Sequence, residues 1–252
     1  MPKRIAHITD THFDDTTALG RGSNPRDNFA KVLEHIKAQG VDSIVFTGDI
    51  GHELPGFEQT YDFLFDSLNA AGLPYKAILG NHDHYDVAKQ RYKGATDGDG
   101  ELYFAYEEGG YKYIYLDSSS TRISPEQYEW LEQQVDTSLK IILFIHHPVV
   151  GLHNSGMDKI YPLNGRERIT RLLQQCKHRV TVFCGHYHMI DARQNGNIIQ
   201  YITPSIAFQV RKDSPSIDIY TDYFGYRIIN IDDVEITTQV YINRGHGFEP
   251  TG

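Results

Sequence analysis

The chain has 252 residues, of which 40% are hydrophobic and 23% charged, and its mean hydropathy is −0.45. This composition is ordinary for a globular protein in water, and no apolar run approaches the ~20 residues that would cross a membrane. The net charge of −9 argues against a broad nucleic-acid surface, which would need clustered Lys and Arg. It leaves an anionic substrate open, because bound metal cations would reverse the local charge.

The N-terminal segment is basic and then briefly apolar, and His7 interrupts the apolar part. It fits a first strand better than a signal peptide, which needs a longer apolar stretch. The chain contains only two cysteines, Cys176 and Cys184, which is too few for a disulfide framework. We therefore expect a reducing, cytoplasmic setting and no membrane association.

The first half of the sequence alternates between strand-like and helix-like segments. Predicted strands are residues 5–9, 43–47, 75–79, 102–106 and 111–116. Predicted helices are residues 27–39, 57–71 and 125–135. The last of these helices has a clear start, because Ser124 suits the N-cap and Pro125 suits the first helical position.

The second half turns mostly to strands. Predicted strands are residues 141–145, 179–184, 192–194, 198–203, 227–231 and 235–241, with a helix at 166–176. Asn195-Gly196 indicates a hairpin, and the last two strands look like a final antiparallel pair. This order predicts one layered α/β domain over residues 1–252, with a mixed sheet or two sheets. Residues 205–252 would form a β extension, where a cap or a dimer contact would lie.

Five short polar clusters each follow an apolar strand directly. They are Asp10-Thr11-His12, Gly48-Asp49, Gly80-Asn81-His82-Asp83, His146-His147-Pro148 and Gly185-His186-Tyr187-His188. Ligands of open α/β sheets bind outside the carboxyl ends of the strands, so five strands ending at one edge would bring the clusters together. A glycine precedes three of the clusters, where a tight turn and a close backbone approach are useful.

The clusters supply seven candidate metal ligands without a thiolate: Asp10, His12, Asp49, Asn81, His146, His186 and His188. Oxygen and imidazole donors of this kind suit Mn, Fe or Zn. Seven ligands are too many for one tetrahedral ion, and they fit two divalent ions roughly 3.5–4 Å apart that share a carboxylate. By contrast, we expect Asp14, Asp15 and Asp83 to cap turns.

The series D-x-H, G-D, G-N-H-D, H-x-P and G-H-x-H, in this order from Asp10 to His188, resembles the calcineurin-like metallophosphoesterase superfamily. The resemblance implies a four-layer αββα sandwich of two mixed β-sheets flanked by helices, with a small C-terminal β extension, and a binuclear metal centre. It implies that Asp10, His12 and His188 bind one metal and that Asn81, His146 and His186 bind the other. Asp49 would bridge the two metals. His146 is chosen over His147 because the family's ligand stands two residues before the proline.

The same resemblance implies in-line attack of a metal-bound hydroxide on phosphorus. His82 would be the catalytic partner, which hydrogen-bonds a phosphoryl oxygen or protonates the leaving alkoxide. Asp83 is a candidate for tuning its pKa.

Within the superfamily, the sequence is most similar to the class III cyclic nucleotide phosphodiesterases and the related glycerophosphodiesterases. The similarity rests on residues 8–12, 146–148, 157–173 and 184–188. After Asp49 the chain lacks the arginine of the protein phosphatases and the tyrosine ligand of the purple acid phosphatases. The resemblance implies a small phosphodiester as substrate, of the 3′,5′-cyclic nucleotide or glycerophosphodiester type, and a homodimer or higher homo-oligomer.

Two alternatives stay open at this point. A phosphomonoesterase or nuclease could use the same metal centre, although the acidic charge weakens the nuclease version. A non-catalytic interaction scaffold would have lost ligands, whereas all seven are present here.

Overall fold

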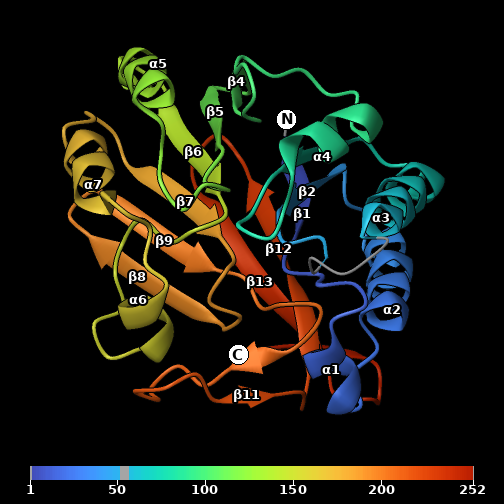
Figure 1. The fold of residues 1–252 in the computed structure, drawn as a ribbon. Coiled ribbons are helices and arrows are strands. Elements are labelled where there is room, and N and C mark those ends of the chain that lie inside the picture. Colours follow the sequence, from blue (N-terminus) through green and yellow to red (C-terminus); the bar gives the residue numbers. More distant parts are fainter. Residues whose placement is uncertain (1, 52–56, 252) are drawn as a thin grey trace.

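The computed structural model describes residues 2–51 and 57–251, and two six-stranded sheets stand face to face at its centre (Figure 1). The first sheet has the order β14-β13-β12-β1-β2-β3. Its strands are β1 (Lys3–Ile8), β2 (Ser43–Thr47), β3 (Tyr75–Ile78), β12 (Phe224–Ile231), β13 (Ile236–Asn243) and β14 (Phe248–Pro250). Strands β1, β2 and β3 run parallel, whereas β12 runs antiparallel to β1, so the sheet is mixed.

The second sheet has the order β4-β5-β6-β7-β9-β8 and is also mixed. Its strands are β4 (Phe104–Glu108), β5 (Tyr111–Leu116), β6 (Lys140–Ile145), β7 (Val180–Cys184), β8 (Asp191–Asn195) and β9 (Ile198–Ile202). The hairpin of β8 and β9 turns at Asn195-Gly196, as the sequence predicted. A separate two-stranded sheet of β10 (Gln209–Val210) and β11 (Ile219–Tyr220) forms the small C-terminal β extension.

Helices flank both sheets, and two short ones lie at one end of the sandwich (Figure 1). The helices are α1 (Thr16–Gly20), α2 (Pro25–Ala38), α3 (Glu58–Ala71), α4 (Tyr85–Arg91), α5 (Pro125–Val135), α6 (Gly156–Ile160) and α7 (Arg166–Gln174). Figure 1 shows α2 and α3 beside the first sheet, and α5 and α7 beside the second. Helix α5 begins as predicted, because the Ser124 side chain accepts a hydrogen bond from the Gln127 N–H at 3.1 Å.

Three apolar clusters lie at the three interfaces of these four layers. Residues of α2 and α3 pack on the first sheet, and residues of α5 and α7 pack on the second. The third cluster lies between the sheets, where the stacked rings of Phe104, Tyr115, Phe144 and Phe183 cross neighbouring strands. Burial of apolar surface at all three interfaces stabilises the sandwich. The predicted αββα architecture is confirmed.

Some boundaries differ from the sequence prediction. Strand β4 begins at Phe104 rather than residue 102, because the Leu102 N–H donates to the Asp117 carboxylate at 2.6 Å instead of joining the ladder. The predicted pair at 227–231 and 235–241 is antiparallel but is not final, since β14 pairs with β13 beyond it.

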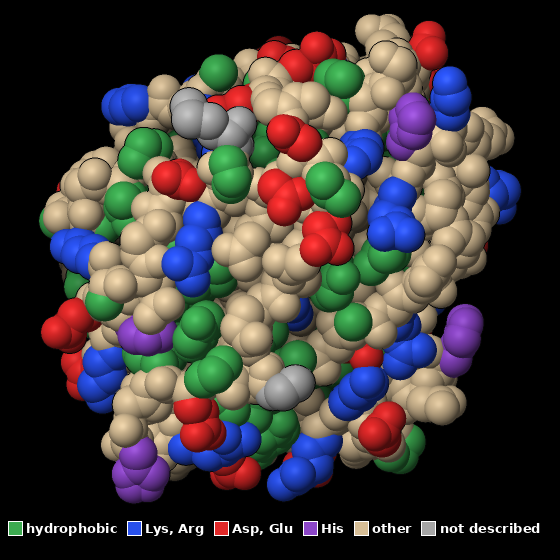
Figure 2. Space-filling view, turned by 180° about the vertical axis from the view of Figure 1, so that it is seen from behind, with side chains coloured by type: hydrophobic (Ala, Val, Ile, Leu, Met, Phe, Trp, Pro, Cys, Tyr) green, Lys and Arg blue, Asp and Glu red, His purple; other side chains and the backbone are tan. Residues whose placement is uncertain are grey.

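In the part of the chain that the structure describes, no helix has the length and apolar character needed to span a membrane. On the face shown in Figure 2, Lys and Arg side chains are interspersed with Asp and Glu and do not gather into one cationic area.

Candidate metal centre

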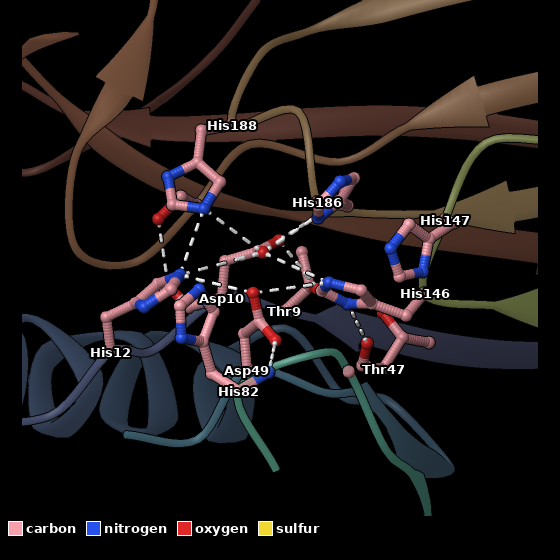
Figure 3. A network of polar contacts seen from close by, with 12 residues as sticks. Thr9, Asp10, His12, Thr47, Asp49, His82, His146, His147, His186 and His188 are labelled. Carbon is pink, nitrogen blue, oxygen red and sulfur yellow. Dashed lines mark hydrogen bonds and ion pairs between the residues drawn. The ribbon is translucent and has the colours of Figure 1, made fainter. Parts of the chain in front are cut away.

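The five polar clusters meet where the two sheets end side by side. Three of them follow β1, β2 and β3 of the first sheet, and two follow β6 and β7 of the second. The expectation of a single sheet edge was therefore wrong in this respect. The clusters still converge, because face-to-face packing brings the carboxyl ends of both sets of strands to the same end of the sandwich (Figure 3).

The backbone at these strand ends is left-handed, which non-glycine residues rarely adopt. The φ angles are 54° at Asp10, 38° at His12, 57° at Asp49, 64° at His186 and 49° at His188. Hydrogen bonds between the clusters hold this conformation; the Asp10 N–H donates to the Gly48 carbonyl at 3.0 Å, and the His12 N–H to the Asp49 carbonyl at 3.0 Å. Strain of this kind persists only where surrounding structure fixes it, and it gathers at functional sites.

Two of the glycines allow the clusters to approach each other closely. Gly48 has a φ of 93°, and a Cβ there would lie 2.2 Å from the Gly80 nitrogen. A Cβ at Gly185 would lie 2.1 Å from the Thr9 hydroxyl oxygen and 2.4 Å from the Asp10 carboxylate. A side chain at either position would separate the loops that carry the polar residues.

Six of the seven candidate ligands form two groups that share Asp49. The first group is Asp10, His12, Asp49 and His188, and the second is Asp49, His146 and His186. All these residues are buried, and the ligand atoms of each group lie within 4.8 Å of one another.

Individual distances are short enough for one ion to contact several donors. Nε2 of His188 lies 3.2 Å from Asp10 Oδ1 and 3.1 Å from His12 Nε2. Oδ2 of Asp49 lies 3.4 Å from Nε2 of His12 and 3.2 Å from Nε2 of His146.

Backbone carbonyls orient three of the histidine rings. Nδ1 of His146 donates to the Thr47 carbonyl at 2.7 Å, and Nδ1 of His188 donates to the Phe208 carbonyl at 2.9 Å. In His186 the pattern is reversed, because Nε2 donates to the Tyr161 carbonyl at 3.0 Å. Metal-ligating histidines are held in this way by their second ring nitrogen, which fixes the tautomer and aims the other nitrogen at the ion.

The donor set fits divalent metal ions. Among the described residues, the buried Oδ1 of Asn81 has no hydrogen-bond partner, and the buried Nε2 of His146 faces the Asp49 carboxylate at 3.2 Å without a well-aligned hydrogen bond. A buried polar atom without a partner is costly, and a metal ion would satisfy both. Asn81 lines the same cavity as His12, Asp49, His186 and His188.

The electrostatics of the cluster also favour a cation. Burial alone would raise the pKa of Asp10, but the charges and hydrogen bond of the nearby histidines outweigh it and hold the pKa at about 2. Burial lowers the pKa of both His12 and His186 to about 3, so their imidazoles are neutral and have a lone pair to offer. At His146, burial is outweighed by the carboxylates of Asp49 and Asp10, which raise the pKa to about 9.

His82 lies at the open side of the cluster. Its ring centroid is 5.1 Å from that of His12, and its backbone N–H donates to Asp49 Oδ1 at 3.0 Å. Asp83 caps the turn, as predicted, because its carboxylate accepts N–H bonds from Gly80, Asp49 and Ile50 at 2.8 to 2.9 Å.

The two other aspartates expected to cap turns, Asp14 and Asp15, differ in what they contact. Asp15 caps α1 by accepting a hydrogen bond from the Thr17 N–H at 2.6 Å, as predicted. The expectation for Asp14 was wrong, because its carboxylate is exposed and forms a two-point ion pair with Arg26 at 2.8 and 2.7 Å.

His147 belongs to neither group of candidate ligands. It is buried, its Nδ1 is 2.8 Å from the Ser118 hydroxyl, and its ring lies 4.0 Å from that of His186. His52, which also lies near the site in sequence, falls outside the described residues.

The site opens into a cavity of about 400 Å³ with one polar and one apolar side. The apolar side consists of Met157, Phe208, Val210, Ile217 and Ile219, and sequence analysis identified none of them as site residues. A weak signal was present in the short alternation of apolar residues on both sides of a Ser-Pro-Ser turn at 214–216.

Comparison with known proteins identifies the family of this chain. A family model described as calcineurin-like phosphoesterase matches residues 3–189. The chain therefore belongs to the calcineurin-like phosphoesterase family. Together with the names of its relatives, this membership supports the predicted metal-dependent phosphoric ester hydrolase.

Curated relatives point to the phosphodiesterase branch. The chain is 26% identical over 219 residues to a probable cyclic nucleotide phosphodiesterase of Fibrobacter succinogenes, covering 86% of this chain and 84% of the relative. It is 30% identical over 186 residues to the probable glycerophosphodiester phosphodiesterase GpdQ of Arcobacter nitrofigilis, covering 69% and 67%. A 3′,5′-cyclic-nucleotide phosphodiesterase of Nostoc sp. is 24% identical over 243 residues, covering 92% and 88%.

Among solved structures, a dimetal phosphatase from Danio rerio superposes with a TM-score of 0.71 at 12% identity, covering 98% of this chain and 96% of that one. At this identity the likeness shows the fold alone.

Proposed function

We propose that this protein is a binuclear-metal phosphodiesterase that hydrolyses small phosphodiesters. The observation that carries the proposal is the place of Asp49, whose carboxylate belongs to both groups of ligand atoms. Two ions that share one carboxylate are the arrangement found in many phosphoester hydrolases.

In this proposal, Asp10, His12 and His188 would hold one ion, Asn81, His146 and His186 would hold the other, and Asp49 would serve both. The orientation of the rings supports the assignment. Nε2 of His146 and of His188 faces the carboxylates, whereas Nδ1 remains as the ligand atom of His186, because its Nε2 donates to Tyr161.

When bound, the two ions lower the pKa of a water molecule and neutralise charge on the phosphoryl oxygens. His82 lines the cavity next to Asn81 and Asp49. From there its imidazole donates a hydrogen bond to a phosphoryl oxygen or a proton to the departing alkoxide. Asp49 orients this residue as well, since its carboxylate accepts the His82 backbone N–H.

The names of the relatives supply the substrate class, a 3′,5′-cyclic nucleotide or a glycerophosphodiester. A substrate panel on protein loaded with Mn²⁺, Fe²⁺ or Zn²⁺ tests it. The panel contains cyclic nucleotides, glycerophosphodiesters and the matching monoesters. We expect turnover of diesters to exceed that of the matching monoesters.

Faster hydrolysis of the monoesters would replace the proposal with a phosphomonoesterase. If no ester is hydrolysed and loaded protein retains less than about one ion per chain, the scaffold alternative gains instead.

A further inference from the structure

The apolar side of the cavity comes largely from one face of the β10–β11 hairpin. Val210 pairs directly with Ile219 across the two strands. Phe208 and Ile217 lie just outside these strands, each two residues away from one member of this pair. All four side chains line the cavity. The short hairpin thus presents a continuous apolar surface, which we call the hairpin wall (Phe208, Val210, Ile217 and Ile219).

The hairpin wall is attached directly to the metal centre. The Val210 N–H donates to the His188 carbonyl at 2.8 Å, and the Phe208 carbonyl accepts from the His188 ring at 2.9 Å. The Phe208 ring lies 4.5 Å from the ring of His188 and 5.5 Å from that of His12. A phosphoryl group at the metals would therefore have this wall beside one of its two ester substituents.

Helix α6 fixes the wall from the other side and adds Met157 to the cavity lining. The Gly156 N–H donates to the Ser214 carbonyl at 2.8 Å, and a Cβ at Gly156 would lie 2.8 Å from the Ser216 backbone. Nearby on the same helix, Asp158 is anchored by Arg166 and by the Tyr187 hydroxyl, which is 2.7 Å away. In Figure 1, α6 and β11 both lie at the same lower end of the molecule.

Charge and hydrogen bonding limit what this side of the cavity accepts. None of the described residues that line it is Lys or Arg. A second anionic group on the substrate would find no cationic side chain there. Hydroxyl groups placed against the four apolar side chains of the wall would find no hydrogen-bond partner on those side chains, which is costly, whereas an apolar ring gains by burial.

We infer that the hairpin wall selects phosphodiesters with one phosphate and an apolar, ring-bearing substituent over diesters with a glycerol-type substituent. This inference rests on the proposed function and names the residues that choose the substrate. The polar groups that act on phosphorus are separate from the wall, so selectivity can change while the metal centre stays intact.

The test compares two alkyl diesters that differ in one substituent, benzyl methyl phosphate and 2,3-dihydroxypropyl methyl phosphate. Both release an alcohol whose hydroxyl is on a saturated carbon, and neither releases a phenol, so leaving-group chemistry is closely matched. Products of the metal-loaded protein are measured by mass spectrometry, and kcat/KM is compared. We expect the benzyl diester to be favoured by about tenfold or more, the usual effect of a well-fitted apolar group.

Ile219→Asn should reduce this ratio about tenfold, and Ile219→Ala should reduce it less, because Ala removes apolar contact without adding a polar group. Leu172→Asn is the matched control, since Leu172 is also half-buried against the same apolar cluster but lies on α7, outside the cavity. Bound metal, measured on every variant, verifies that the centre is intact.

Equal kcat/KM for the two diesters in the unmodified protein would overturn the inference and leave the phosphodiesterase proposal standing. The same holds if Ile219→Ala, with its metal bound, keeps the full ratio. Failure of the loaded, unmodified protein to hydrolyse any diester would instead overturn the proposed function, and the inference with it.

Discussion

The metal centre and the hairpin wall are built in opposite ways. The centre lies at the ends of paired strands of four to six residues, and Asp10, Asp49 and His146 are almost completely inaccessible to solvent. The wall consists of two strands of two residues each, and Ile217 and Ile219 are only partly buried. The difference suggests a division of labour, in which the rigid sandwich fixes the chemistry and a short appended element sets selectivity.

The largest effect should come from the carboxylate that joins the two ligand groups. Asp49→Asn keeps the size of the side chain, and Asn tolerates left-handed backbone, but the substitution removes the charge that the two proposed ions would share. We expect kcat/KM on a diester to fall by about 10³-fold or more, since the ions supply several kcal/mol of transition-state stabilisation.

Asp14→Asn is the control for that variant. Asp14 also has a positive φ, of 64°, but its carboxylate is exposed and paired with Arg26. We expect near-normal turnover and metal content. Equal losses in the two variants would contradict a special role for Asp49.

A smaller effect should follow from changing the geometry of the centre without touching a ligand. In Gly185→Ala the new methyl group would meet Thr9 and the Asp10 carboxylate, so we expect metal affinity to fall about 10–100-fold. Gly20→Ala is the control, because no atom lies within 4 Å of its added Cβ. Titration calorimetry with Mn²⁺ measures both. Unchanged affinity in Gly185→Ala would show that the loops tolerate separation.

The smallest effect concerns the support of the wall. Burial would raise the pKa of Asp158, but hydrogen bonds from Arg166 and Tyr187 outweigh it and lower the pKa. Asp158→Asn should reduce the free energy of unfolding by about 2 kcal/mol at pH 7, the value typical of hydrogen bonds to a buried charge. Glu167 is an exposed partner of the same arginine, with its carboxylate 3.8 Å away. Glu167→Gln should reduce the free energy of unfolding by less than about 0.5 kcal/mol.

The pH dependence of this difference has a definite sign. A carboxylate whose folded pKa lies below its unfolded pKa stabilises the protein above the unfolded value, about 4 for aspartate. The gap between the unmodified protein and Asp158→Asn should therefore be constant near neutrality and shrink as the pH falls through the lowered pKa. Urea unfolding of both proteins in chelator, from pH 7 to pH 3, measures it. A gap that grows towards acid would be inconsistent with the lowered pKa.

Much of the fold and of the centre could be predicted because the signals are local. A polar residue directly after an apolar strand marks a strand end, and this pattern alone predicts that Asp10, Asp49 and His146 lie near one another. The pattern of residues does not show how the five strands divide between two sheets, because that division depends on packing of the aromatic faces. It also could not foresee that Arg26 would pair with Asp14, because nothing local to either residue encodes the pairing.

The wall was missed for a different physical reason. Strands as short as Gln209–Val210 and Ile219–Tyr220 carry too few residues for a period of two to stand out. Their position depends on non-local hydrogen bonds to His188 and α6, which no local pattern encodes.

We propose that two ions share Asp49, and anomalous X-ray diffraction from crystals of the Mn²⁺-loaded protein can locate them. We expect two manganese peaks roughly 3.5–4 Å apart on either side of the Asp49 carboxylate, one next to Asp10, His12 and His188 and the other next to Asn81, His146 and His186. A single peak at full metal loading, or two peaks of which only one contacts Asp49, would contradict this proposal.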